Sequence, residues 1–224
     1  TNNELVLKRL RLAQYSHDFF SIAVLQKMAD GSDEKIGFMK KAFDRTNKIV
    51  KEDNLQISLS GYEYLRSLYL PPVISSKVMK LPEIWDFKVD PDDRGMAEKW
   101  FESSDKLHWD KISTLSDWTK QGYDYHGTAW YRIQFHMPEN KGEENNAKLA
   151  ILFGAVDGEA QIFLDGNLIG QQIEPAGKMW DKAFAVQLPE NITYDSLCNL
   201  TVRVTKDHAA AGIWKPVEIV WQKN

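Results

Sequence analysis

All eight tryptophans of this 224-residue chain lie after residue 83. The part before that point contains none, and its basic side chains outnumber the acidic ones, whereas acidic side chains are in excess from Ile84 onward. A change of composition this sharp marks a boundary between structural units. Prolines at 71, 72 and 82 favour an extended chain there, because the residue before a proline is kept out of the helical region. We therefore predict a helical segment at residues 1–70, a connector at 71–83 and a second domain at 84–224.

Hydrophobic periodicity supports the helical segment. Leu5, Leu12 and Phe19 recur every seven residues, which places them on one face of a helix. Helices in a segment of only about 70 residues cannot easily bury a hydrophobic core by themselves. We expect this segment to pack on the second domain or on a domain upstream of the sequence.

The second domain is predicted to be all β. Short apolar runs separated by turn residues occur at 133–137, 149–153, 161–164, 184–188, 200–204 and 217–221. Asp165-Gly166 between two of these runs predicts a tight hairpin. Strands of this length and spacing indicate a jelly-roll β-sandwich, so the predicted fold class is mainly β with a small helical segment in front. The aromatic residues expected to pack in its core are Trp85, Phe87, Trp130, Tyr131 and Trp221.

Composition argues against several functional classes. The formal net charge is −4, and no clustered excess of Lys and Arg is present, so nucleic acid is not an expected partner. No apolar run is long enough to predict a transmembrane segment. Cys198 is the single cysteine, which excludes an internal disulfide and a cysteine-based zinc site.

Several motifs in the second domain occur in a recognisable order. They are W-D-F-K-V-D-P-D-D-R-G from Trp85, Y-H-G-T-A-W-Y-R from Tyr125, G-A-V-D-G-E-A-Q-I-F-L-D-G-N-L-I-G from Gly154 and G-I-W-K-P-V from Gly212. With these motifs the stretch 85–221 resembles the sugar-binding, galactose-binding-like jelly roll of glycoside hydrolase family 2 and related β-galactosidase-like proteins. The helical segment is similar to the helical tail that follows the barrel in α-glucuronidase-like enzymes.

The resemblance implies a C-terminal fragment of a larger bacterial glycoside hydrolase that degrades polysaccharide. It also implies export to the periplasm, the cell surface or the medium. In the family resembled, the catalytic carboxylates lie in a barrel domain, which this sequence does not contain. Its own residues show no nucleophile elbow and no glycine-rich phosphate loop. Asp157 and Glu159 are interpreted as part of a hairpin rim, so we predict a fragment without catalytic residues.

The segment Asp90-Pro-Asp92-Asp93-Arg-Gly95 is the one place where we consider a metal site. Three carboxylates in one turn are ligands that Ca²⁺ could use, although the spacing of an EF-hand loop is missing. Proline and glycine in the same run favour a tight turn with Asx-type hydrogen bonds. No other cofactor is expected.

A ligand site is predicted where loops converge. In an antiparallel meander the end of one strand lies beside the start of the next, which brings the loops 118–127, 155–160, 174–182 and 206–213 to one end. Aromatic faces and charged groups in such loops are suited to sugars. The segment 212–216 is interpreted as fixing the start of the last strand. The candidate ligand-binding residues are Trp118, Tyr123, Tyr125, His126, Asp157, Glu159, Trp180, Asp207 and His208.

Two functions from different classes follow. The leading one is accessory carbohydrate recognition within a glycoside hydrolase, with the loops lining a subsite. The alternative is a structural or interaction domain that supports a catalytic barrel and has no sugar affinity of its own. The expected partners are a carbohydrate and the upstream catalytic domain of the same chain.

Overall fold

The computed structural model describes residues 72–102, 107–139, 147–172, 180–208 and 210–223, together with residues 7, 10, 14, 41, 44 and 45. The chain divides into two compact units, residues 1–70 and 71–224. The six described residues of the first unit are helical, but the prediction for that segment otherwise lies outside the described residues. No helix among the described residues is long and apolar enough to cross a membrane.

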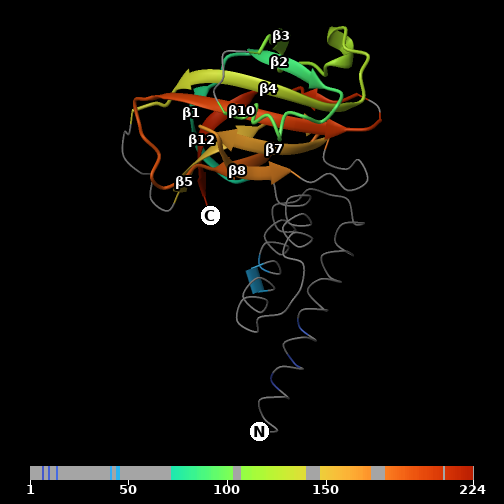
Figure 1. Ribbon diagram of the computed structural model, residues 1–224. Coiled ribbons are helices and arrows are strands. Elements are labelled where there is room, and N and C mark those ends of the chain that lie inside the picture. The colour runs from blue at the N-terminus through green and yellow to red at the C-terminus, as the bar shows by residue number, and fades with distance from the viewer. Residues whose placement is uncertain are drawn as a thin grey trace. The chain divides into compact units, whose positions relative to one another are not determined.

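The second unit contains two antiparallel sheets, and this confirms the predicted mainly-β sandwich (Figure 1). The four-stranded sheet has the order β1 (Ile74–Lys80), β12 (Val217–Lys223), β5 (Ala147–Phe153) and β9 (Phe184–Gln187). The six-stranded sheet has the order β3 (Asp110–Ser113), β2 (Ile84–Asp90), β4 (Gly127–His136), β10 (Leu197–Lys206), β7 (Glu159–Leu164) and β8 (Asn167–Gln172). A short pair, β6 (Val156–Asp157) and β11 (Gly212–Ile213), and the 3-10 turn η1 (Thr119–Gln121) complete the described elements.

The predicted connector at 71–83 is instead largely occupied by a strand. Residues 74–80 form β1, which pairs with β12 at the edge of the four-stranded sheet. The Leu81 N–H then donates a hydrogen bond to the Val217 carbonyl (2.9 Å), which continues the pairing. The prediction was wrong because an edge strand faces water along much of its length and lacks the apolar alternation of a buried strand. The sandwich therefore begins before residue 84.

The hairpin at Asp165-Gly166 is confirmed. It joins β7 to β8, and Leu164 lies opposite Asn167 across the turn. Both turn residues have positive φ, 47° and 80°, which is the requirement of a type I′ turn. The Asp165 carboxylate also accepts a hydrogen bond from the Asn199 N–H on β10 (2.7 Å), so the turn is tied to the neighbouring strand.

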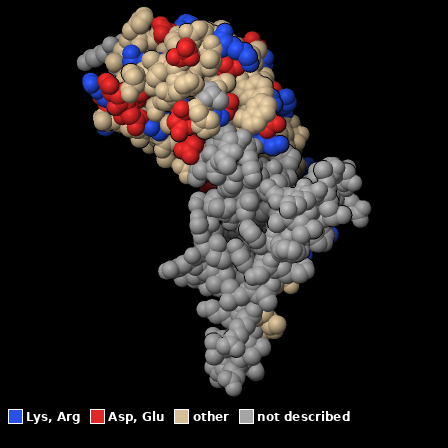
Figure 2. Space-filling view, turned by 90° about the vertical axis from the view of Figure 1, so that its right-hand side faces the viewer, with Lys and Arg blue, Asp and Glu red and all other residues tan. Residues whose placement is uncertain are grey.

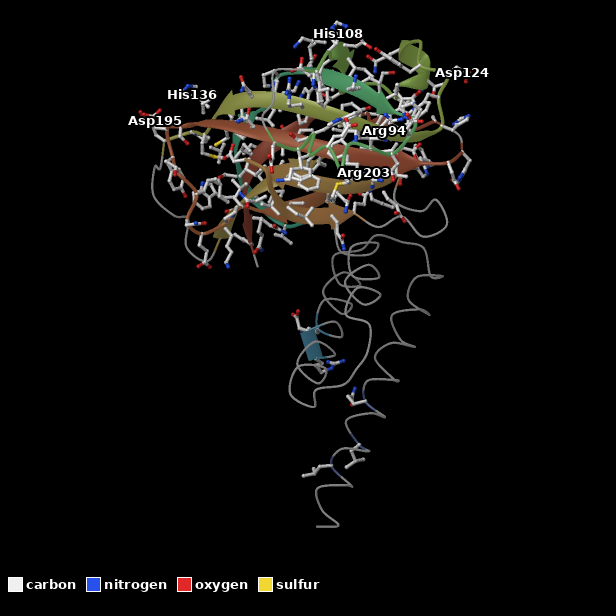
Figure 3. The ribbon with its side chains drawn as sticks, in the orientation of Figure 1. Arg94, His108, Asp124, His136, Asp195 and Arg203 are labelled. Carbon is white, nitrogen blue, oxygen red and sulfur yellow. The ribbon has the colours of Figure 1, made fainter. Side chains whose placement is uncertain are left out.

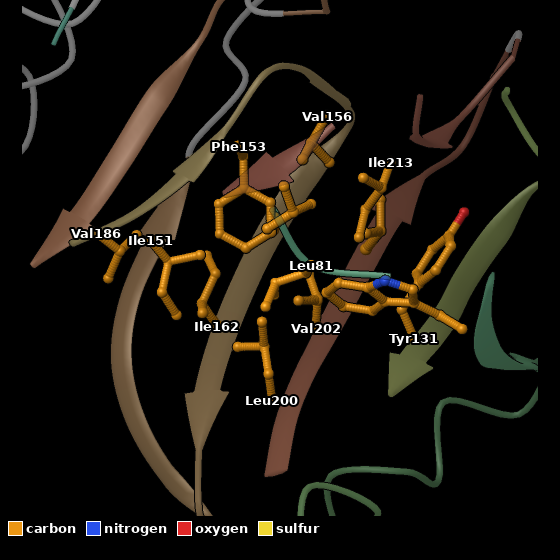
Figure 4. Packing of buried hydrophobic residues seen from close by; sticks show 14 of the residues in the cluster. Leu81, Tyr131, Ile151, Phe153, Val156, Ile162, Val186, Leu200, Val202 and Ile213 are labelled. Carbon is orange, nitrogen blue, oxygen red and sulfur yellow. The ribbon is translucent and has the colours of Figure 1, made fainter. Parts of the chain in front are cut away.

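The hydrophobic core lies between the two sheets (Figure 4). Ile151 of β5 and Ile162 of β7 come from opposite sheets and both are fully buried. Along β10, alternate residues such as Leu200 and Val202 face inward, as the two-residue period of a strand requires. Of the aromatic residues predicted to pack in the core, Trp85, Phe87 and Tyr131 are fully buried there, and Trp221 is partly buried against it. Trp130 is also fully buried, but in a separate cluster outside this core.

A second aromatic cluster lies on the outer face of the six-stranded sheet. Trp130 on β4 points away from the sandwich core and packs with Trp100 and Phe163. Phe101 stacks on Phe163, with ring centroids 4.7 Å apart. The segment 91–102 therefore covers this face of the sheet.

The carboxylate of Asp90 joins this cluster to the turn that follows β2. Its Oδ1 accepts a hydrogen bond from the Arg94 N–H (2.8 Å). Its Oδ2 accepts from the Gly95 N–H (2.8 Å) and from Trp130 Nε1 (2.9 Å). Asp90 is 2% exposed, so these donors compensate for the burial of its charge. The Asx-type turn weighed for residues 90–95 is present.

We predict that Gly95→Ala destabilises the protein by about 2 kcal/mol, because the new methyl group would overpack a tight site. A Cβ at Gly95 would lie 2.5 Å from Trp130 Cε2 and 2.8 Å from Asp90 Oδ2. Urea unfolding followed by tryptophan fluorescence measures the change, and Met96→Ala at the exposed neighbouring position is the control. Equal stability of the two variants would contradict the prediction.

Candidate functional site

Strand register brings the predicted loops to one end of the sandwich. Gly127 at the start of β4 lies opposite Lys206 at the end of β10, and Glu159 at the start of β7 lies opposite Thr205. Gln172 at the end of β8 lies opposite Ala160. We call this end the rim, formed by residues 117–127, 155–160, 180–182, 206–208 and 210–215. The rest of the predicted loop 174–182 and residue 209 lie outside the described residues.

Trp118 is not available to a ligand, which corrects its prediction as a binding residue. Its side chain is fully buried in the core. The indole N–H donates to the Tyr125 carbonyl (2.9 Å), and the ring lies 5.9 Å from that of Phe87. The Trp118 side chain therefore closes the rim end of the hydrophobic core.

Tyr123 and Tyr125 are only partly exposed, because both pack against the core. The Tyr123 ring meets Phe87 edge-on at 4.7 Å, and its hydroxyl donates to Asp110 Oδ2 (3.0 Å). Burial raises the pKa of the Tyr123 hydroxyl, and the Asp110 carboxylate adds to the shift. Burial likewise raises the pKa of Tyr125. Each ring therefore anchors its loop and offers a ligand only a limited surface.

The predicted acids differ in their availability. Asp157 forms an ion pair with Lys206, and the exposed fractions of the two side chains are only 13% and 7%. Its charge is thus neutralised inside the rim. Glu159 is exposed at the start of β7. Gly158 between them has a φ of 124°, so the two acids do not lie on one continuous strand.

Three further predicted residues, Asp207, His208 and His126, are exposed at the rim. Asp207 and His208 follow β10 and contact each other, and the hydrogen bond from His208 holds the pKa of the Asp207 carboxyl below its usual range. His126, at the end of the loop 118–127, is also exposed. Asp117, which precedes Trp118 at the rim, is only 7% exposed, and this burial by itself would raise the pKa of its carboxyl. Its hydrogen bonds with Lys120 nonetheless hold its pKa below the usual range.

Trp180 is the predicted residue with the largest exposed aromatic surface, and it has a partner that sequence reasoning missed. Its side chain is 47% exposed and stacks on Trp214, with ring centroids 5.5 Å apart and planes 17° apart. Trp214 Nε1 donates to the Trp180 carbonyl (2.6 Å). Lys215 Nζ donates to the Asp181 carbonyl (3.2 Å) and lies 4.5 Å from the centre of the Trp214 ring. We call Trp180, Trp214 and Lys215 the tryptophan platform.

The sequence feature that could have identified Trp214 is its position in the motif G-I-W-K-P-V, just before the start of β12. The short β6–β11 pair holds that segment, since Ile213 pairs with Val156 and the Trp214 N–H donates to the Ala155 carbonyl (3.3 Å). The motif thus positions the platform in addition to fixing the start of β12.

The carboxylates weighed as calcium ligands have protein partners. Asp90 accepts the hydrogen bonds described above, Asp92 pairs with Arg94 (3.0 Å), and Asp93 pairs with Arg203 (2.7 Å). Within the described part of the chain, no group of three or more His, Cys, Asp or Glu side chains is arranged to hold a metal ion.

On the face seen in Figure 2, acidic and basic side chains are interspersed.

Comparison with solved structures identifies similar folds in β-glucuronidases. One from Ruminococcus gnavus, in complex with D-glucaro-d-lactam, has a TM-score of 0.56 and 16% identity over 71% of this chain and 31% of that chain. One from an uncultured Clostridium sp. has a TM-score of 0.54 and 23% identity over 69% of this chain and 30% of that chain. These likenesses show that this chain shares a fold with part of those enzymes. This chain spans less than a third of the length of those enzymes.

Comparisons at the level of sequence identify no relative. No protein-family model matches the chain, and no curated protein matches it.

We predict that Lys206→Met destabilises the protein by about 3 kcal/mol, because it leaves the Asp157 carboxylate nearly buried without its partner. The double variant Lys206→Met with Asp157→Leu should regain most of that stability. Thermal unfolding of both variants measures the difference. Lys182→Met, which removes an exposed lysine 3.7 Å from Asp181, is the control and should change stability little. A double variant no more stable than Lys206→Met would refute the expectation.

Proposed function

We propose that residues 71–224 form an accessory carbohydrate-recognition domain of the galactose-binding-like type. The domain belongs to a larger glycoside hydrolase and does not catalyse the reaction by itself. The observation that carries the proposal is the tryptophan platform: an exposed indole is held in a fixed orientation at the loop end of a sandwich. The fold likeness to β-glucuronidases supports the assignment to a glycoside hydrolase.

Stacking on an aromatic face is a common way to bind a sugar, because the C–H patches of the ring are apolar while its hydroxyls need polar partners. Trp180 offers such a face, since nearly half of its surface is exposed. Its orientation is set before binding by stacking on Trp214 and by the hydrogen bond from Trp214 Nε1. A side chain that is already ordered loses less conformational entropy when a ligand binds.

Polar partners for sugar hydroxyls are present on the same rim. The exposed side chains there include His126, Glu159, Asp207 and His208. Lys215 keeps its ammonium beside Trp214, and among the described residues no carboxylate forms an ion pair with it. These groups and the platform belong to loops from different strands, an arrangement that suits a shallow site for a sugar unit.

The proposal places this domain beside a catalytic domain of the same polypeptide. The solved β-glucuronidases that share its fold are more than three times as long as the matched part. The acid and the nucleophile of the parent enzyme would lie in that additional part, and the segment 1–70 would pack against it or against the sandwich. Export of the parent protein, as for an enzyme that degrades external polysaccharide, belongs to the same proposal.

A structural or interaction domain remains the second candidate, and a specific observation favours it. Trp118 is buried, and Tyr123 and Tyr125 are packed against the core, so three of the four predicted aromatic ligands serve the fold. In this case the tryptophan platform would contact a neighbouring domain and bind no sugar.

The test is a glycan-array screen of the 224-residue protein, followed by calorimetric titration of each glycan that binds. Trp180→Ala should weaken binding at least tenfold, because it removes the stacking face, and Trp214→Ala should weaken it because Trp180 loses its support. Leu168→Ala, at an equally exposed apolar position on β8, should leave the affinity unchanged. Binding that survives Trp180→Ala would move the site away from the platform. No binding to any glycan would establish the structural alternative.

A further inference from the structure

A cavity of about 580 Å³ lies at the end of the sandwich opposite the rim. It is formed by the β7–β8 hairpin on one side and by residues 189–198, the approach to β10, on the other. Figure 3 shows this arrangement through two labelled residues: Asp195, next to the cavity, and Asp124, on the rim, are at opposite ends. The volume falls in the range of small-molecule sites, about 300–1,000 Å³.

The walls of this cavity are held in place by hydrogen bonds within the protein. On the hairpin side, Asn167 Nδ2 donates to the Asp165 carbonyl (3.1 Å), and Asp165 Oδ1 accepts from the Asn199 N–H (2.7 Å). On the other side, Ser196 Oγ donates to the Thr193 carbonyl (2.7 Å), and the Ser196 carbonyl accepts from the Met137 N–H (2.8 Å). The cavity is thus formed before any ligand arrives.

Polar groups on the second wall are free to bind. Asn191 and Thr193 are exposed, and their side chains make no hydrogen bond to any described residue. The Asn191 amide offers both donors and an acceptor, and the Thr193 hydroxyl offers one donor and an acceptor. Asp165 of the hairpin lines the same cavity.

Apolar surface completes the lining. Leu164 and Cys198 are buried, at 3% and 1% exposure, whereas Leu197 is 55% exposed. Burial raises the pKa of the Cys198 thiol, so this side of the cavity stays uncharged at neutral pH. A ligand here meets hydrogen-bonding groups and C–H surface in the same small volume.

The residue types that line the cavity indicate which class of ligand it can bind. None of the described residues that line the cavity is Lys, Arg, His or aromatic. An anion would face the Asp165 carboxylate with no compensating cation, which is unfavourable. A flat aromatic ligand would find no ring to stack on. A neutral molecule with several hydroxyl groups suits a carboxylate, amides and hydroxyls arranged around aliphatic side chains.

We propose that this cavity is a second binding site, specific for a neutral saccharide of one or two units. It is separate from the tryptophan platform, and it does not depend on the function proposed for the rim. A domain with a site at each end can bind two parts of one polysaccharide or two separate chains.

The experiment is a titration of the ¹⁵N-labelled 224-residue protein, monitored by two-dimensional NMR. The probes are D-glucose, D-galactose, D-xylose and cellobiose, each added to tens of millimolar. At least one should shift the side-chain amides of Asn191 and Asn167 and the backbone amides of Leu197 and Cys198, with one common dissociation constant. D-glucuronate should shift these signals less than D-glucose does, because its carboxylate would meet that of Asp165.

Asn191→Ala and Thr193→Ala test the assignment, since both side chains are exposed and neither change disturbs a described hydrogen bond. Each should weaken binding about fivefold, the loss expected for one hydrogen bond. Trp180→Ala is the control and should leave these shifts unchanged, which separates this site from the rim. The proposal is overturned if none of the four probes moves the cavity signals, or if affinity is unchanged in both variants.

Discussion

The carboxylate of Asp90 connects the end of β2 and the turn after it to Trp130, which lies 40 residues further along the chain. Through one buried side chain, the end of β2, the turn that follows it and the indole of Trp130 on β4 are held together. The aromatic cover over the six-stranded sheet depends on this contact, because the backbone from Gly95 leads directly into Trp100 and Phe101. Asp90 therefore has a structural role, although its position among three acidic residues also suggested a metal ligand.

The two ends of the sandwich make different use of the same antiparallel geometry. At the rim, several large aromatics are turned inward and close the core, whereas Trp180 and Trp214, among the residues that the structure describes, form an accessible platform. At the other end, a tight hairpin and the approach to β10 leave space between them. Shared strand directions thus produce an aromatic site at one end and a hydroxyl- and amide-lined cavity at the other.

Sequence reasoning succeeded where local patterns determine the structure. The Asp165-Gly166 hairpin, the strand at 200–204 and the aromatic packing all follow from short-range rules on turns and apolar runs. It failed at β1, because the pairing of an edge strand with β12 leaves little local trace in the sequence. The Lys77 side chain, for example, donates a hydrogen bond to Glu218, which is 141 residues away. For the candidate site, the convergence of loops was predictable from strand direction. The burial of Trp118 and the stacking of Trp180 on Trp214 were not, because each depends on how a side chain packs after the sheets have formed.

The cover formed by residues 91–102 has a consequence for how molecules reach this domain. This segment is held by the packing of Trp100 and Phe101 on Trp130 and by the Asp90 turn. Lifting it would expose Trp100, Trp130 and Phe163 together and remove two of the three donors to the Asp90 carboxylate. On this part of the outer face of the six-stranded sheet, a ligand therefore meets residues 91–102 and not the buried rings of Trp130 and Phe163.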